Sequence, residues 1–173
     1  MTDQVWNPVL RDQVDWLWTN QLRGRLDGLT DDEYFWEPVP DCWSVRPRGT
    51  GTAPVQGGSG AMTVDFAFPQ PDPPPFTTIA WRLAHVIVGV LAVRNAAHFG
   101  RPATDYGSFE YAATATEALA QLDREYARWR AGVESLGESG LARPCGPAEG
   151  PYADAPLAAL VLHINREVLH HGA

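Results

Sequence analysis

The sequence has little of several features that define common protein classes. Its two cysteines, Cys42 and Cys145, lie far apart and form no C-x-x-C pair. A disulfide between them is one interpretation, but two buried free thiols in a reducing cytoplasm is the more economical one. The N-terminus has no basic run followed by an apolar stretch, so we expect no signal peptide. These absences predict a cytoplasmic protein.

Positive charge is also scarce. The chain has 13 Lys and Arg against 21 Asp and Glu, which gives a formal net charge of −8. The basic residues are scattered among acidic neighbours, whereas binding to a phosphate backbone depends on clustered Lys and Arg. We therefore expect no nucleic-acid partner. The glycine run Gly57-Gly58-Ser59-Gly60 lacks the following Lys and helix of a phosphate-binding loop.

A long uninterrupted apolar run is missing as well. The most apolar stretch, residues 79–93, contains Arg82 and His85 and falls short of the ~18 apolar residues of a spanning helix. We therefore expect no membrane association. With 173 residues, 45% of them hydrophobic, and seven Trp, the chain can bury a substantial core. It is predicted to form a single domain over residues 1–173.

Apolar periodicity predicts four helices. The first spans residues 8–26, where apolar side chains recur every fourth position. The second begins at Thr77 or Thr78 and ends near Phe99, and the third covers residues 114–136, where Thr114 and Glu117 have the spacing of a capping box. The fourth begins near Pro156 and continues to the end of the sequence. This pattern predicts an all-α four-helix bundle.

Residues 46–75 interrupt that helical pattern with a long Gly- and Pro-rich segment. Its one strand-like piece is residues 62–68, where Val64, Phe66 and Phe68 alternate with smaller residues. Three such side chains are wasteful in a solvated linker. We expect them to pack against the bundle as an ordered flap. Trp36 and the other Trp residues are also expected in the core.

The chemically informative residues lie on the last helix. His163, Glu167 and His171 are spaced by four residues and form one row along a helix face. Neighbours four apart can ligate one ion together, as in H-E-x-x-H zinc helices. All three cannot, because His163 and His171 are separated by roughly 12 Å of helix rise, while ligand atoms of one ion lie within about 4 Å of one another.

His85 decides how that row is interpreted. On an arbitrary helix end, these would be solvated residues that interact favourably with the helix dipole. His85, however, lies in the middle of the most apolar helix, where an unpaired ionisable group is costly. A satisfied core histidine is the plain alternative. A Glu/His pair on another helix of the same bundle favours a metal site instead, because facing helices commonly build such sites.

The sequence resembles the DinB-like superfamily, which includes YfiT-type and mycothiol-dependent maleylpyruvate isomerase-type proteins. The resemblance rests on Trp43-Ser44-Val45, on Leu83-Ala84-His85, and on Arg166-Glu167-Val168-Leu169-His170-His171-Gly172. It covers most of the chain. The sequence departs from the family at residues 46–75, an insertion where Trp-Ser normally leads almost directly into the second helix.

The resemblance implies that His85, Glu167 and His171 are the metal ligands and that His163 is not. Three ligands leave a coordination position open, as in catalytic zinc sites, although imidazole and carboxylate also accept nickel or iron. Zinc or nickel is the expected ion. By resemblance, the protein is expected to be a metal-dependent transferase that activates a low-molecular-weight thiol of the mycothiol type.

Two other functional interpretations stay open. One is a non-catalytic, metal-stabilised bundle that binds a small molecule or a partner. The other is a metal-free bundle in which His85 hydrogen-bonds to Glu167, which the Glu167/His171 spacing disfavours. The apolar faces of the helices, the second especially, predict a homodimer.

Weaker signals complete the prediction of the site. His163, His170 and Arg82 are candidates for contacts with a small-molecule substrate. His98 is expected to interact with the dipole at its helix end without taking part in chemistry. Arg94 is expected to form a salt bridge inside the bundle.

Overall fold

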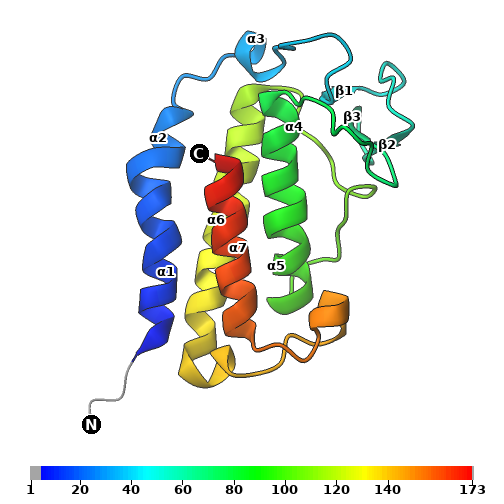
Figure 1. Ribbon diagram of the computed structural model, residues 1–173. Helices are drawn as coiled ribbons and strands as arrows, with labels where there is room; N and C mark the ends of the chain where they lie inside the picture. The colour runs from blue at the N-terminus through cyan, green and yellow to red at the C-terminus, as the bar shows by residue number, and fades with distance from the viewer. Residues whose placement is uncertain (1–4, 173) are drawn as a thin grey trace.

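A computed structural model describes residues 5–172. Four long helical segments run side by side, as Figure 1 shows. They are α1 Trp6–Leu17 continued by η1 Trp18–Leu22 and α2 Arg23–Arg25; α4 Ile79–Ala84 continued by η2 His85–Ala92 and α5 Val93–His98; α6 Ala115–Leu141; and α7 Leu157–Gly172. The η1 and η2 pieces are π-helical. Two short helices, α3 Asp31–Tyr34 and the 3₁₀ helix η3 Pro147–Tyr152, lie in the connections.

The helix boundaries follow local chemistry. The Thr78 hydroxyl caps the second segment by accepting a hydrogen bond from the Trp81 amide at 3.2 Å, as predicted. The Thr114 hydroxyl caps α6 in the same way, but the Glu117 carboxylate accepts from the Ala113 amide, so the reciprocal half of the predicted capping box is absent. Gly137, with a φ of 57°, interrupts α6 near the predicted end of that helix.

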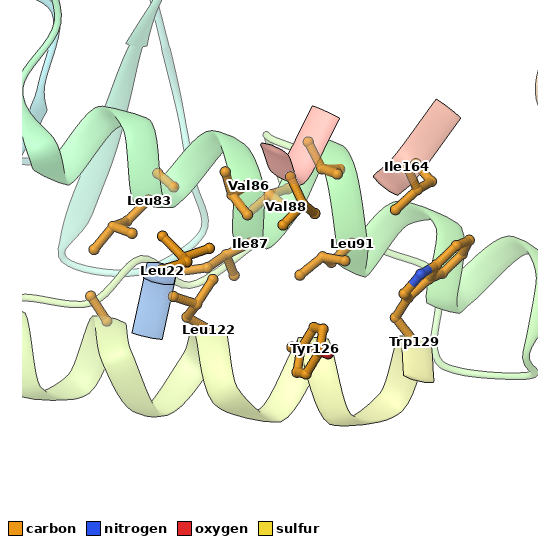
Figure 2. Packing of buried hydrophobic residues seen from close by; sticks show 14 of the residues in the cluster. Leu22, Leu83, Val86, Ile87, Val88, Leu91, Leu122, Tyr126, Trp129 and Ile164 are labelled. Carbon is orange, nitrogen blue, oxygen red and sulfur yellow. The ribbon is translucent and has the colours of Figure 1, made fainter. Parts of the chain in front are cut away.

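One cluster of buried side chains links all four segments. Figure 2 shows Leu83, Ile87 and Leu91 of the second segment facing Leu122 and Trp129 of α6. Both α6 and α7 contact α1 on one side and η2 on the other. Burial of these side chains is the main stabilising contribution, because removing apolar surface from water dominates folding.

The second helical segment extends beyond residues 79–93, the most apolar stretch of the sequence. Over Ile79–His98 it has 20 residues and a mean hydropathy of 1.3, sufficient by composition alone to cross a membrane. However, 56% of its most apolar window is buried inside the bundle. That burial is the pattern of a helix in the core of the bundle.

The all-α expectation is incomplete, because a three-stranded antiparallel sheet lies beside one end of the bundle (Figure 1). Its strands are β1 Val45–Pro47, β2 Val55–Gly57 and β3 Met62–Phe66, in the order β1-β3-β2. Val45 pairs with Val64, and Val55 pairs with Phe66. A bridge between Trp43 and Thr77 joins the start of this region to the start of the second helical segment.

The predicted flap is correct in part. Val64 is 2% exposed, whereas Phe66 is 36% and Phe68 is 88% exposed. The expectation for Phe68 was wrong because β3 ends at Phe66, so Phe68 lies beyond the paired part of the strand. Trp36 was also placed wrongly in the core, since it is 65% exposed, and so were Trp6 and Trp16 on α1, which are 51% and 55% exposed. Cys42 and Cys145 are free thiols, the first buried and the second half-buried.

Candidate metal centre

Three predicted ligands converge where α7 packs against η2. Glu167 and His171 are one turn apart on α7, and the His171 Nε2 lies 3.4 Å from the Glu167 Oε2. His85 begins η2, and its ring centroid is 4.5 Å from that of His171. One ligand atom from each residue can be chosen so that all three lie within 4.8 Å of one another. This separation is slightly larger than the about 4 Å between ligand atoms of one ion, so small side-chain movements would bring all three atoms to a common ion.

Tyr106, from the loop between α5 and α6, holds the ring of His85. The Tyr106 hydroxyl is 2.7 Å from the His85 Nδ1. On the other side, Trp81 stacks on His85 with centroids 5.5 Å apart and planes inclined by 6°. A hydrogen bond at one imidazole nitrogen fixes the ring and leaves the other nitrogen as the ligand atom. The Nε2 of His85 is therefore the atom left to bind an ion. The hydrogen-bond partner of His85 is Tyr106, whereas the metal-free interpretation required Glu167.

Gly89 makes the contact between Tyr106 and His85 sterically possible. It lies one turn after His85 in η2, and a Cβ built there would be 2.0 Å from the Tyr106 Oη. The same Cβ would lie 3.3 Å from the His85 Nδ1. Any larger side chain would occupy the space that the tyrosine hydroxyl needs. A glycine four residues after a candidate ligand histidine was the one sequence signal that could have indicated this contact.

The electrostatics keep the three ligands deprotonated. Burial lowers the pKa of His85 to about 4, and the charge of His171 acts in the same direction. Burial also lowers the pKa of His171, with a further contribution from His170. Burial alone would raise the pKa of Glu167, but the hydrogen bond from Arg166 and the neighbouring histidines hold it below its usual value. Deprotonated ligands are what metal binding requires.

One buried atom of the centre has no hydrogen-bond partner within the described part of the protein. Among the described residues, the His171 Nδ1 is a buried nitrogen without a hydrogen-bond partner. An unsatisfied buried polar atom is costly. Two neutral imidazoles and one carboxylate match the ligand preferences of zinc, nickel and iron. The residues present therefore fit a divalent cation.

The other predicted site residues are placed differently. The His163 Nδ1 accepts a hydrogen bond from the Arg166 guanidinium at 2.7 Å and lies 3.6 Å from the Glu167 Oε1, whereas His171 lies near the Oε2. It lines a separate cavity of about 640 Å³ together with Arg166. His170 is exposed, with its ring 4.9 Å from that of His171. The structure thus brings His163 and His170 next to the ligands without adding either to them.

The interpretation of His98 requires a correction. Its Nε2 lies 2.9 Å from the Glu149 Oε1, and both side chains are nearly buried. His98 therefore pairs with the loop before α7, which is more than a dipole interaction at a helix end. Arg94 forms the expected salt bridge, with Glu149 at 3.4 Å, and donates to the Gly89 carbonyl at 2.7 Å.

Each of the two histidines of the centre lines a different cavity. A cavity of about 510 Å³ is lined by His171 together with Arg25, Arg82 and apolar side chains of the bundle. A second cavity, of about 310 Å³, is lined by His85 together with Tyr106 and residues of the sheet. One histidine of the candidate centre therefore lines a cavity with two arginines, and the other lines a cavity with aromatic walls.

Comparison with known families gives an assignment for this fold and ligand arrangement. A sequence profile of the DinB superfamily matches residues 13–173. The chain belongs to the DinB superfamily. It has no significant match among curated proteins or solved structures. Membership agrees with a bundle that brings one histidine of the second segment to a Glu/His pair on the last helix.

Proposed function

We propose that this DinB-superfamily protein is a divalent-metal-dependent transferase that activates a low-molecular-weight thiol. The observation that supports the proposal is that His171 and His85, two of the three candidate ligands, each line a cavity, and that the two cavities differ in character. A transfer reaction needs two reactants on either side of the reacting atoms. A site that only stabilised the fold would need neither cavity.

The residues of the chain have distinct parts in this scheme. Glu167 contributes the negative charge that offsets a dication, and Tyr106 holds the imidazole of His85 in position. Arg25 and Arg82 line the cavity of about 510 Å³ and suit the carboxylates of an acidic thiol. When bound, the ion supplies a Lewis acid that lowers the pKa of a thiol at its open position.

The proposed transfer is a nucleophilic displacement by the sulfur of the thiol. The sulfur of the thiol forms a bond to a carbon of the acceptor, and the leaving group departs with the electron pair of the bond that breaks. The thiol proton passes to water. Zinc and nickel are both compatible with the ligand set.

A non-catalytic metal-stabilised bundle is the second candidate. It is favoured by the fact that the three ligands connect α7 to η2, so a bound ion would also tie two helices together. The two candidates differ in what removal of the ion does. A scaffold loses much of its stability, by the mass-action effect of a tightly bound ligand. An enzyme whose core rests on apolar packing loses activity while its bundle stays folded.

The deciding experiment measures metal content, thermal unfolding and thiol-dependent transfer in the wild type and in His171→Ala. His170→Ala is the matched control for metal content and thermal unfolding, because it removes an adjacent exposed imidazole that is not one of the three candidate ligands. We expect His171→Ala to lose the ion and the transfer activity with a small change in melting temperature. A large fall in melting temperature, with no transfer activity in the wild type, would leave the scaffold as the function.

Two further properties are proposed with the function. The free thiols of Cys42 and Cys145 support a cytoplasmic location. We also propose a homodimer, supported by the exposed Trp6, Val9 and Trp16 on α1, which are 51%, 48% and 55% exposed. Light scattering that finds a monomer at micromolar concentration would contradict the dimer.

A further inference from the structure

Five aromatic rings form a closed circuit beside the candidate metal centre. Centroid distances between successive rings are 6.2, 6.1, 6.4, 5.5 and 5.9 Å, in the order Trp43, Phe66, Tyr106, His85, Trp81 and back to Trp43. All five line the cavity of about 310 Å³. We call this cavity the aromatic chamber. Its rings come from the sheet region, the second helical segment and the loop before α6.

The chamber exposes aromatic surface that folding alone does not explain. Phe66 is 36% and Phe68 is 88% exposed, although both lie on or just after an ordered strand. Exposed apolar side chains gathered at a concave site commonly mark a ligand-binding surface. Phe68 lines the chamber together with the five rings of the circuit.

The orientations of the rings indicate the shape of the ligand. His85 is inclined by 6° to Trp81 and by 17° to Tyr106, and Phe66 is inclined by 16° to Tyr106. Trp43 is tilted by 42° to both Phe66 and Trp81. Aromatic rings prefer offset stacking or edge-to-face contacts with a partner ring. The four nearly parallel rings therefore suit a flat group better than a rounded one.

The charges of the lining indicate an uncharged ligand. Asp65 is the only acidic residue among the described lining residues. Its Oδ2 accepts from the Arg46 guanidinium at 2.9 Å and from the Ser44 amide at 3.0 Å, so the charge of Arg46 compensates it, while its buried Oδ1 has no hydrogen-bond partner among the described residues. The lining residues that the structure describes include no Arg or Lys. An anion would therefore find no counter-charge there, and a cation would find only the faces of the rings and a carboxylate already paired with Arg46.

We infer that the aromatic chamber binds a planar, uncharged aromatic group. His85 belongs both to the chamber and to the candidate ligand set, so a ring held in the chamber lies beside the reacting position. The group is therefore the acceptor in the thiol transfer, and this assignment of its role rests on the proposed function. With an aryl chloride as acceptor, sulfur bonds to the ring carbon, chloride leaves with the electron pair, and the thiol proton passes to water.

The test measures binding to metal-free protein, so that it does not depend on activity. Isothermal titration calorimetry with 2-naphthol is compared with 2-decalol, a non-planar alcohol of similar size, and with tetramethylammonium. We expect 2-naphthol to bind at least tenfold more tightly than either. Phe66→Leu keeps apolar volume but removes the flat ring, and it should weaken 2-naphthol binding by roughly threefold to tenfold.

Phe76→Ala is the matched control, because Phe76 is 68% exposed and does not line the chamber. It should leave 2-naphthol binding unchanged. Equal loss in Phe76→Ala and Phe66→Leu would place the probe elsewhere and overturn the inference. Tighter binding of 2-decalol or tetramethylammonium would overturn the planar, uncharged class.

The two proposals can fail separately. Absence of 2-naphthol binding in a protein that binds metal and transfers thiol overturns the chamber assignment alone. Chamber-specific 2-naphthol binding without metal uptake supports the chamber and overturns the transferase. If Phe68→Ala converts a dimer to a monomer and 2-naphthol does not bind, the aromatic surface is a contact between copies of the chain, and the inference is wrong.

Discussion

Replacing Gly89 with alanine places a methyl group where Tyr106 reaches His85. The new Cβ would lie 2.0 Å from the Tyr106 Oη and 2.8 Å from its Cζ. Real Cβ contacts are not this short, so the tyrosine has to move away. Gly89 lies inside a helical segment, where alanine is favoured over glycine by about 1 kcal/mol. The substitution therefore removes a side-chain contact without making the helix itself less favourable.

The magnitude follows from the role of the hydrogen bond between Tyr106 and His85. Loss of an outer partner of a metal-ligating histidine typically lowers metal affinity by about 10- to 100-fold, which is roughly 1.4–2.7 kcal/mol of binding free energy. We expect Gly89→Ala to lie in this range in a chelator-competition titration with Zn²⁺. Tyr106→Phe removes only the hydroxyl and should lower the affinity in the same direction.

Gly24→Ala is the matched control, because a Cβ at Gly24 meets nothing within 4 Å. It should gain a little helix stability and leave metal affinity unchanged. If Gly89→Ala and Tyr106→Phe both bind Zn²⁺ as tightly as the wild type, the contact with Tyr106 does not hold the ligand. Tyr106 would then be a packing residue of the aromatic chamber only.

Three further predictions concern the charge, the titration and the core. Glu167→Gln keeps the shape but removes the negative charge, so metal affinity should fall less than in His171→Ala; an affinity equal to the wild type would contradict ligation by the carboxylate. Burial lowers the pKa of His85 to about 4, so below pH 6.5 this histidine takes up a proton in the unfolded chain before it does so in the folded one. The free energy of unfolding of metal-free protein should therefore be independent of this group above pH 6.5 and should decrease as the pH falls. At pH 5 the free energy of unfolding should be lower by roughly 2 kcal/mol than above pH 6.5 because of this group. Urea unfolding of wild type and His85→Gln measures it, and a difference between the two proteins that stays the same at every pH would contradict the prediction. Trp129→Ala should lower the free energy of unfolding by roughly 3–5 kcal/mol, because Trp129 is 1% exposed; a loss below 1 kcal/mol in the same assay would refute that view of the core.

The helices were predictable because their signals are periodic and local. The caps at Thr78 and Thr114 and the row formed by Glu167 and His171 require only the spacing of residues along one helix. The choice of His171 over His163 came from family resemblance, since spacing alone allowed either end of the row. In the structure, His171 faces His85, whereas His163 interacts with Arg166.

Contacts between distant loops and the bundle could not be predicted in this way. Tyr106 is 21 residues from His85 and lies in an aperiodic loop. Phe68 and Trp36 are strongly apolar, and composition alone places such side chains inside a protein. Their exposure depends on where the neighbouring parts of the chain cease to pack over the strand or loop, and tertiary packing decides this. The aromatic chamber was missed for the same reason, because its rings come from three separate regions of the chain.

The stacking of Trp81 on His85 makes the candidate centre observable by fluorescence. An indole in van der Waals contact with an imidazole changes its emission when that imidazole becomes positively charged or binds a metal. A paramagnetic ion such as Ni²⁺ quenches a nearby excited indole, whereas Zn²⁺ has no unpaired electrons with which to do so. The Trp81 emission, isolated as the difference between wild type and Trp81→Phe, would therefore report in real time that an ion has arrived and which kind it is.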